Sequence, residues 1–170
     1  PELDTRVELH IDAYLPEEYV SDEQMRVEIY KRIAMVADED SRMAIEDELI
    51  DRFGDIPAPV ENLIQIAQLR GATRKLGVSH LFLKPDGMHF KLDEKHMPPL
   101  DLLFEAVSRT DPRFRFDVGK KPGLVLSQRG MTAESALKEA IPLMQKVLDH
   151  IKQLRQDQPG GQGEQQVKLP

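Results

Sequence analysis

The sequence predicts an α+β domain, in which three N-terminal helices precede a mostly antiparallel sheet of about five strands and a long C-terminal helix. The main observation is a change of period. Apolar residues recur every three or four positions over residues 21–77, and at alternate positions in short runs from residue 78 onward. Glycine and proline separate the short runs, as they do in hairpins. We expect residues 1–155 to form a single domain, and residues 156–170, rich in Gln and Gly, to form a disordered polar tail.

The first half begins with a predicted strand, because apolar and polar residues alternate over residues 7–15. A first helix is expected to begin at Ser21, which has the spacing of a capping box with Gln24. Acidic residues precede the second helix, Gly54 ends it, and prolines mark the start of the third. The predicted buried face of the second helix consists of Ala44, Ile45, Leu49 and Phe53.

The second half supplies the rest of the sheet and two more helices. Thr132 and Ser135 mark the start of the last helix, and Pro142 is expected to kink it or delay its true start. The other predicted elements are strands at residues 78–83, 88–92, 113–118 and 124–126 and a short helix that follows Pro98 and Pro99.

The net charge of −7 is distributed unevenly along the chain. Residues 1–55 carry 17 acidic and 6 basic side chains, a net −11, whereas residues 56–170 carry 13 acidic and 17 basic ones, a net +4. An acidic N-terminal part disfavours contact with nucleic-acid phosphates and favours a basic protein partner. The mildly basic remainder leaves a weaker nucleic-acid interpretation open.

Several classes of function find no support among the residues. The chain has no Cys, which excludes a disulfide framework and suits a reducing cytoplasm, and its five His lack the spacing of a metal site. Gly119-Lys120-Lys121 is followed by proline, so it predicts a hairpin turn and not a phosphate loop. We therefore expect no catalytic, cofactor-binding or metal-binding residue, and no membrane-spanning segment or secretion signal.

One charged pattern does suggest a function. Glu48, Asp51 and Asp55 are spaced three and four residues apart, so they should line one exposed edge of the second helix. Such an edge is either a solvated acidic face or a surface that binds a basic partner. The residues alone leave both interpretations open.

Five runs of sequence together resemble one known family. They are LHIDAYLP at residues 9–16, IYKRIA at 29–34, ELIDRFGDIP at 48–57, LR at 69–70 and KLGV at 75–78. At these separations the series resembles the C-terminal domain of bacterial transcription-repair coupling factor, and the resemblance covers roughly residues 3–155.

The resemblance implies a non-catalytic regulatory domain of a large bacterial, cytoplasmic protein. The parent protein is expected to bind stalled RNA polymerase and DNA, to translocate with a motor that uses ATP and Mg, and to recruit UvrA for nucleotide excision repair. Within that protein, this domain is expected to pack on the N-terminal UvrB-like module as an autoinhibitory clamp that masks UvrA binding. Glu48 and Asp51 are the expected partner-binding residues, with Asp55 and Arg52 beside them, and we expect a monomer.

Two alternatives follow from the residues. The domain could be an accessory that contacts DNA or the motor through a basic hairpin at residues 113–121, which contains Arg113, Arg115, Lys120 and Lys121. Such lysines and arginines also occur simply to keep a sheet edge soluble. A small independent enzyme is the other alternative, but no nucleophile–base pair, metal spacing or phosphate loop supports it.

Overall fold

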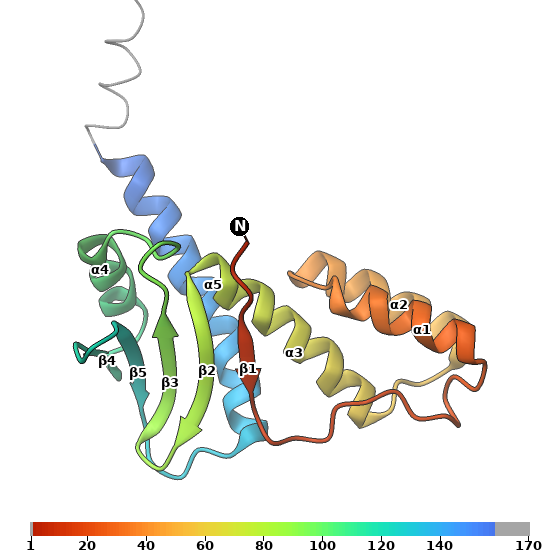
Figure 1. The fold of residues 1–170 in the computed structure, drawn as a ribbon. Coiled ribbons are helices and arrows are strands. Elements are labelled where there is room, and N and C mark those ends of the chain that lie inside the picture. Colours follow the sequence, from red (N-terminus) through yellow and green to blue (C-terminus); the bar gives the residue numbers. More distant parts are fainter. Residues whose placement is uncertain (1, 159–170) are drawn as a thin grey trace, which may run out of the picture.

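A computed structural model describes residues 2–158 and confirms the predicted α+β architecture (Figure 1). The described strands form one five-stranded sheet in the order β1-β2-β3-β5-β4, in which β1 pairs with β2 in parallel and the other pairs are antiparallel. The elements are β1 (Arg6–Glu8), α1 (Glu23–Ala34), α2 (Glu39–Phe53), α3 (Ala58–Lys75), β2 (Val78–Lys84), β3 (Gly87–Leu92), α4 (Leu100–Thr110), β4 (Phe114–Asp117), β5 (Gly123–Ser127) and α5 (Ala133–Asp157).

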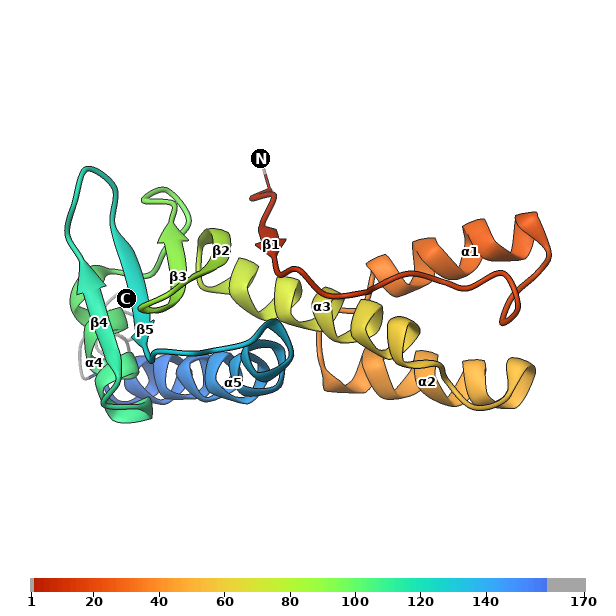
Figure 2. The ribbon, with the colours of Figure 1, turned by 90° about the horizontal axis from the view of Figure 1, so that it is seen from below.

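The sheet is covered by helices on one face (Figure 2). Leu81, Phe90 and Leu124 alternate with outward-facing neighbours along their strands, and all three are fully buried beneath the helical layer. The neighbouring side chains His80 and Lys91 are partly exposed on the opposite face. The strands therefore have the in–out alternation that the sequence predicted.

The interior contains two apolar clusters that share α3. The first packs α1 and α2 against the N-terminal half of α3, through Val60 and Ile64. The second packs the sheet, α4 and α5 against the C-terminal half of α3, through Leu69 and Leu76. Because α3 contributes to both clusters, it fixes the position of the first three helices relative to the sheet.

One glycine allows α3 to approach the α1–α2 turn closely. A Cβ atom built at Gly71 would lie 2.6 Å from the backbone Cα and carbonyl oxygen of Ala37. Real Cβ atoms do not come this close to backbone atoms. Glycine at this position is therefore required by the packing of the turn against the helix.

The predicted first strand is much too long. Only Arg6–Glu8 pairs with β2, and the chain from Leu9 onward leaves the sheet for the helices. There the Tyr14 amide donates to the carbonyl of Pro59 at 3.2 Å, and Leu15 is buried in the first cluster. The alternating pattern thus reflects burial of every second residue, with Leu9 and Ile11 packed on the second cluster and Leu15 in the first. Sequence periodicity alone does not distinguish this from a strand.

Three details of the helices also differ from the predictions. The cap of α1 is Asp22, whose side chain makes no capping bond, so the predicted box of Ser21 and Gln24 is wrong. Ala44 is exposed instead of lying on the buried face of α2. Pro142 lies inside α5 and does not delay the start of the helix, which begins at Ala133 after a capping box formed by Thr132 and Ser135.

The predicted boundary of the tail shifts slightly. Residues 156 and 157 are the last residues of α5, so the helix extends just past the expected end of the domain at residue 155. The rest of the predicted tail, residues 159–170, lies outside the described residues.

Candidate protein-interaction surface

The candidate surface is the acidic edge of α2, formed by Glu48, Asp51 and Asp55. α2 begins with a reciprocal capping box between Asp38 and Ser41, and its core-facing side chains lie in the first apolar cluster. The acidic edge lies on the C-terminal half of the helix and the turn that follows. The predicted spacing places Asp51 and Asp55 in solvent, whereas Glu48 is half-buried.

Glu48 is held within the domain by two arginines. Its carboxylate accepts a hydrogen bond from Arg52 Nη1 at 2.8 Å and another from Arg32 Nη1 on α1. The Arg32 bond, and to a smaller degree the Arg52 bond, lowers the pKa of Glu48 below its usual value. Glu48 is therefore ionised at neutral pH, and its charge is largely compensated by the two guanidinium groups that tie α1 to α2.

Arg52 belongs to the same network. Besides Glu48, its guanidinium contacts the Met25 sulfur at 2.8 Å through Nη2 and lies 5.1 Å from the centroid of the Phe53 ring. Phe53 in turn packs against Tyr19, with 5.7 Å between ring centroids. Arg52 is exposed, but it is already engaged with acidic, thioether and aromatic groups of its own domain.

The uncompensated charge on the edge lies at Asp51 and Asp55. Both are exposed, and neither forms an ion pair with another residue in the range 2–158. The turn that carries Asp55 is fixed by Tyr19, whose hydroxyl donates to the carbonyl of Gly54 at 2.9 Å. Burial, and to a smaller degree the charge of Asp55, raises the pKa of Tyr19. The two aspartates are therefore held in place and are available to a cationic partner.

Sequence reasoning missed two kinds of residue on this surface. Asp47 is exposed one helical turn before Asp51, so it extends the acidic edge. Ile50 and Met43 are each 50% exposed and lie seven residues apart, which places them on one face of α2. An apolar residue beside uncompensated acids is typical of a protein interface. The available signal was that both apolar residues fall outside the buried stripe of the helix.

The pKa of another carboxyl group on α2, that of Glu46, is shifted because of helix packing. Burial between α2 and α3, followed by a hydrogen bond and repulsion from Glu61, raises the pKa of Glu46 to about 7. Arg42 donates to Glu46 and partly compensates its charge. The pair lies in the contact between two helices, so we interpret it as part of the packing and not as an acid–base site.

The basic hairpin is less available than its sequence suggested. Arg113 donates to Asp111 at 3.0 Å and to Glu139 on α5 at 3.2 Å, so it connects β4 to a helix. The Arg115 guanidinium donates to the carbonyl of Pro112 at 2.7 Å. Of the four predicted basic residues, only Lys120 and Lys121 make no ion pair or hydrogen bond with another residue in the range 2–158.

Two further findings concern the part of the chain that the structure describes. No group of three or more His, Asp or Glu side chains there is arranged to hold a metal ion. None of its helices is long and apolar enough to cross a membrane.

The architecture is that of a domain whose structure is already known. A crystal structure of the C-terminal domain of a transcription-repair coupling factor superposes with a TM-score of 0.77, covering 89% of this chain and 96% of that one at 24% identity. A model of the TRCF domain family matches residues 9–102. This match covers more than half of the chain, so the chain belongs to the TRCF domain family, as the five sequence runs predicted.

Curated relatives agree with this assignment. The transcription-repair-coupling factor of Bacillus subtilis is 27% identical over 155 residues, which cover 89% of this chain and 13% of that protein. That of Staphylococcus epidermidis is 47% identical over 75 residues, which cover 44% of this chain and 6% of the relative. The chain thus corresponds to a small part of each of these much longer proteins.

Proposed function

We propose that this domain is a non-catalytic regulatory module of a transcription-repair coupling factor, which binds the UvrB-like N-terminal module of the same protein and so masks UvrA binding. The observation that carries the proposal is the acidic edge of α2, where Asp51 and Asp55 are exposed without an ion pair in residues 2–158. Ile50 lies beside Asp51 and supplies apolar contact area. A partner surface with arginines around an apolar group would complement this arrangement.

The proposal assigns the chemistry to other parts of the parent protein. The ATP- and Mg-dependent motor, the contacts with RNA polymerase and DNA, and the recruitment of UvrA in transcription-coupled nucleotide excision repair belong there. The parent acts in the bacterial cytoplasm, where RNA polymerase and DNA are found. This domain contributes a reversible contact that regulates access to another surface.

The physical basis of the clamp is a weak contact within one chain. An interface centred on a few exposed charge pairs is selective and sensitive to salt, but its affinity is modest. Two domains in one chain have a high effective concentration, so a modest affinity is enough to keep them together. A rearrangement of the motor that lowers this effective concentration would then shift the population toward the open state.

Within the edge, Asp51 is the proposed main contact and Glu48 has a supporting role. Glu48 is already bonded to Arg32 and Arg52, so a partner arginine would have to replace one of them. Asp51 would pair with a partner without losing an ion pair or side-chain hydrogen bond to residues 2–158. This ranking differs from the equal roles that the sequence suggested for Glu48 and Asp51.

Calorimetric titration against the separately purified UvrB-like module tests the proposal. We expect saturable binding that weakens with salt, and a loss of at least about tenfold in affinity for Asp51→Lys combined with Asp55→Lys. The matched control reverses two exposed acids on the sheet side, Glu94→Lys with Glu134→Lys, and should change the affinity by less than about twofold. Equal losses in both variants would show that only net charge matters.

The same titration with duplex DNA examines the alternative function. DNA binding that is lost on changing Lys120 and Lys121 to glutamate, without any binding of the UvrB-like module, would favour an accessory that contacts DNA. The protein-binding function is better supported, because Arg113 and Arg115 already bond to groups of their own domain.

A further inference from the structure

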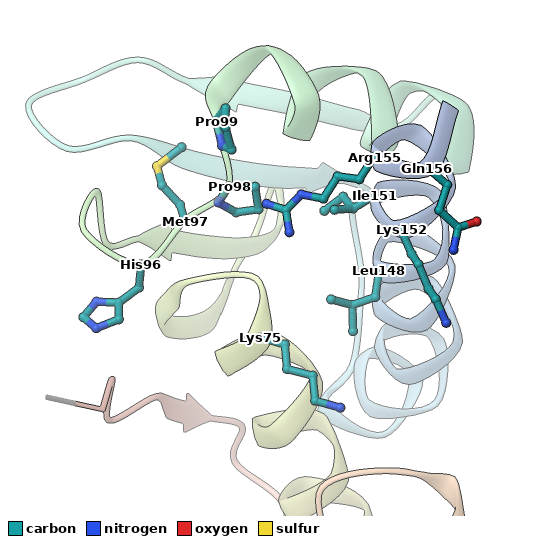
Figure 3. Close-up of a pocket in the computed structure, with 10 residues that line it drawn as sticks. All are labelled: Lys75, His96, Met97, Pro98, Pro99, Leu148, Ile151, Lys152, Arg155 and Gln156. Carbon is teal, nitrogen blue, oxygen red and sulfur yellow. The ribbon is translucent and has the colours of Figure 1, made fainter. Parts of the chain in front are cut away.

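A second surface lies at the other end of α3, where the end of this helix, the segment before α4 and the last turns of α5 enclose a cleft of about 530 Å³ (Figure 3). This volume lies within the range of protein binding sites. The residues that line it are Lys75, His96, Met97, Pro98, Pro99, Leu148, Ile151, Lys152, Arg155 and Gln156.

The floor of the cleft is apolar. Leu148 and Ile151 point into it from α5, and Pro98 faces them from the segment before α4, whereas the Met97 side chain points away from α5 (Figure 3). Pro98 and Ile151 are buried, whereas Leu148 is partly exposed at the bottom of the opening. This floor therefore suits the insertion of an apolar group.

The rim of the cleft is cationic. Lys75 on α3 and Lys152 and Arg155 on α5 are exposed, and none of the three forms an ion pair with a residue in the range 2–158. No acidic side chain lines the cleft. The field of Lys75 does reach Asp38, whose pKa is lowered mainly by hydrogen bonds from Ser41 and to a smaller degree by that lysine.

Two of these cations, from two helices, point across one opening. Arg155 extends from α5 across the cleft toward Pro98, and Lys75 points toward α5 from the opposite side (Figure 3). A negatively charged occupant would therefore meet positive charge on both sides while its apolar part contacts Leu148 and Pro98.

We propose that this cleft binds an acidic segment of another protein, which inserts an apolar side chain between Leu148 and Pro98 and places carboxylates against Lys75, Lys152 and Arg155. Charge complementarity favours an anion, and the apolar floor favours a peptide over a sugar–phosphate backbone, which has no large apolar group to insert. Every described buried side-chain polar atom already has a hydrogen-bond partner, so none is left to orient a small polar ligand in the cleft.

The cleft is distinct from the acidic edge of α2. Asp55 lies just before the start of α3 and Lys75 is its last residue. The 18 residues of that helix correspond to about 27 Å at 1.5 Å per residue. The two surfaces thus have opposite charge and lie at opposite ends of one rigid element, and the second partner does not depend on the clamp.

Fluorescence anisotropy with the 170-residue chain tests the proposal. The probe is a fluorescein-labelled peptide of glutamate with leucine at every fourth position, compared with a peptide of equal charge in which serine replaces leucine. We expect saturable binding of the leucine peptide, with affinity at least about tenfold above that of the serine peptide. Absence of saturable binding, or equal binding of the two peptides, would overturn the proposal.

Two sets of variants locate the binding. Lys152→Glu with Arg155→Glu should weaken the leucine peptide by at least about tenfold, whereas the control Lys120→Glu with Lys121→Glu, with the same change of charge on the hairpin, should not. All four positions are exposed, so the fold should persist. Leu148→Gln should weaken only the leucine peptide. Equal losses in both charge variants would contradict the proposal, as would duplex DNA that binds more tightly than the peptide and is lost with the same cleft variant.

Discussion

The two halves of this molecule differ in charge as well as in architecture. The helical arm consists of α1, α2 and the first half of α3, and the sheet body consists of the sheet, α4, α5 and the second half of α3. The arm lies mostly in residues 1–55, with a net charge of −11, and the body in residues 56–170, with a net charge of +4. One chain of modest net charge thereby presents an acidic edge and a cationic cleft in separate places.

The helix α3 has two roles in this arrangement. It completes both apolar clusters, so neither the arm nor the body has a full core without it. It also sets the distance between the acidic edge and the cleft. A change in how the arm packs on α3 should therefore alter the geometry of the proposed clamp without altering the cleft.

The largest expected effect on the free energy of unfolding comes from creating a cavity in either apolar cluster. Leu49 in the arm and Leu103 in the body are both fully buried, so Leu49→Ala and Leu103→Ala should each lower the free energy of unfolding by about 2–5 kcal/mol. Because α3 is shared, we expect one cooperative transition in urea, followed by circular dichroism. A Leu49→Ala protein that unfolds in two separate steps would contradict this account, since the arm would then be an independent unit.

A smaller loss is expected where the arm meets α3. Gly71→Ala places a Cβ atom against the backbone of Ala37, so the α1–α2 turn must move and the free energy of unfolding should fall by about 1–3 kcal/mol. Gly119→Ala is the control, because its Cβ would meet only the Asp117 carboxylate at 3.5 Å. The urea midpoint measures both, and equal midpoints would show that the contact is not tight.

Glu46, which lies on α2 in the arm, should make the stability of the domain depend on pH. Its folded-state pKa is raised to about 7 from 4.5, so its ionisation penalises the folded state increasingly as pH rises from about 4.5 to 7. Glu46→Gln should therefore raise stability at pH 8, by on the order of 1 kcal/mol, and change it little near pH 4.5. Asp47→Asn is the exposed control, and thermal melts at the two pH values give the comparison.

The smallest expected effect concerns the arginine that holds Glu48. Arg32→Gln removes an exposed ion pair, so stability should fall by no more than about 1 kcal/mol. The released Glu48 charge should strengthen binding of the UvrB-like module by about twofold to threefold. Calorimetric titration measures this gain, and weaker binding would mean that Arg32 itself contacts the partner.

Much of the fold was predictable because most apolar side chains follow the period of their element. The change of period near residue 78 separates the helices from the hairpins, and the boundaries of α2 and α3 follow from Gly54 and Pro57. The strand prediction for residues 9–15 was wrong for a physical reason. These residues alternate in burial because Leu9 and Ile11 pack on the cluster of the body and Leu15 lies in the cluster of the arm, and no local signal reports the absence of a neighbouring strand.

The site was predictable only where it is local in sequence. Asp51 and Asp55 follow from helical spacing, but Arg32 lies 16 residues from Glu48, and no pattern links the two. The cleft is less visible still, because Lys75, Met97 and Arg155 belong to three separate segments that only the packing of α3 against α5 brings together.

The most direct test of the clamp is UvrA capture by the full-length transcription-repair coupling factor that carries this domain. Immobilised UvrA should capture little of the unaltered protein and at least about tenfold more of the Asp51→Lys, Asp55→Lys variant, because the reversed edge no longer holds the UvrB-like module. The Glu94→Lys, Glu134→Lys control should behave like the unaltered protein. Equal capture of all three proteins, each with an unchanged melting temperature, would contradict a masking role for the acidic edge of α2.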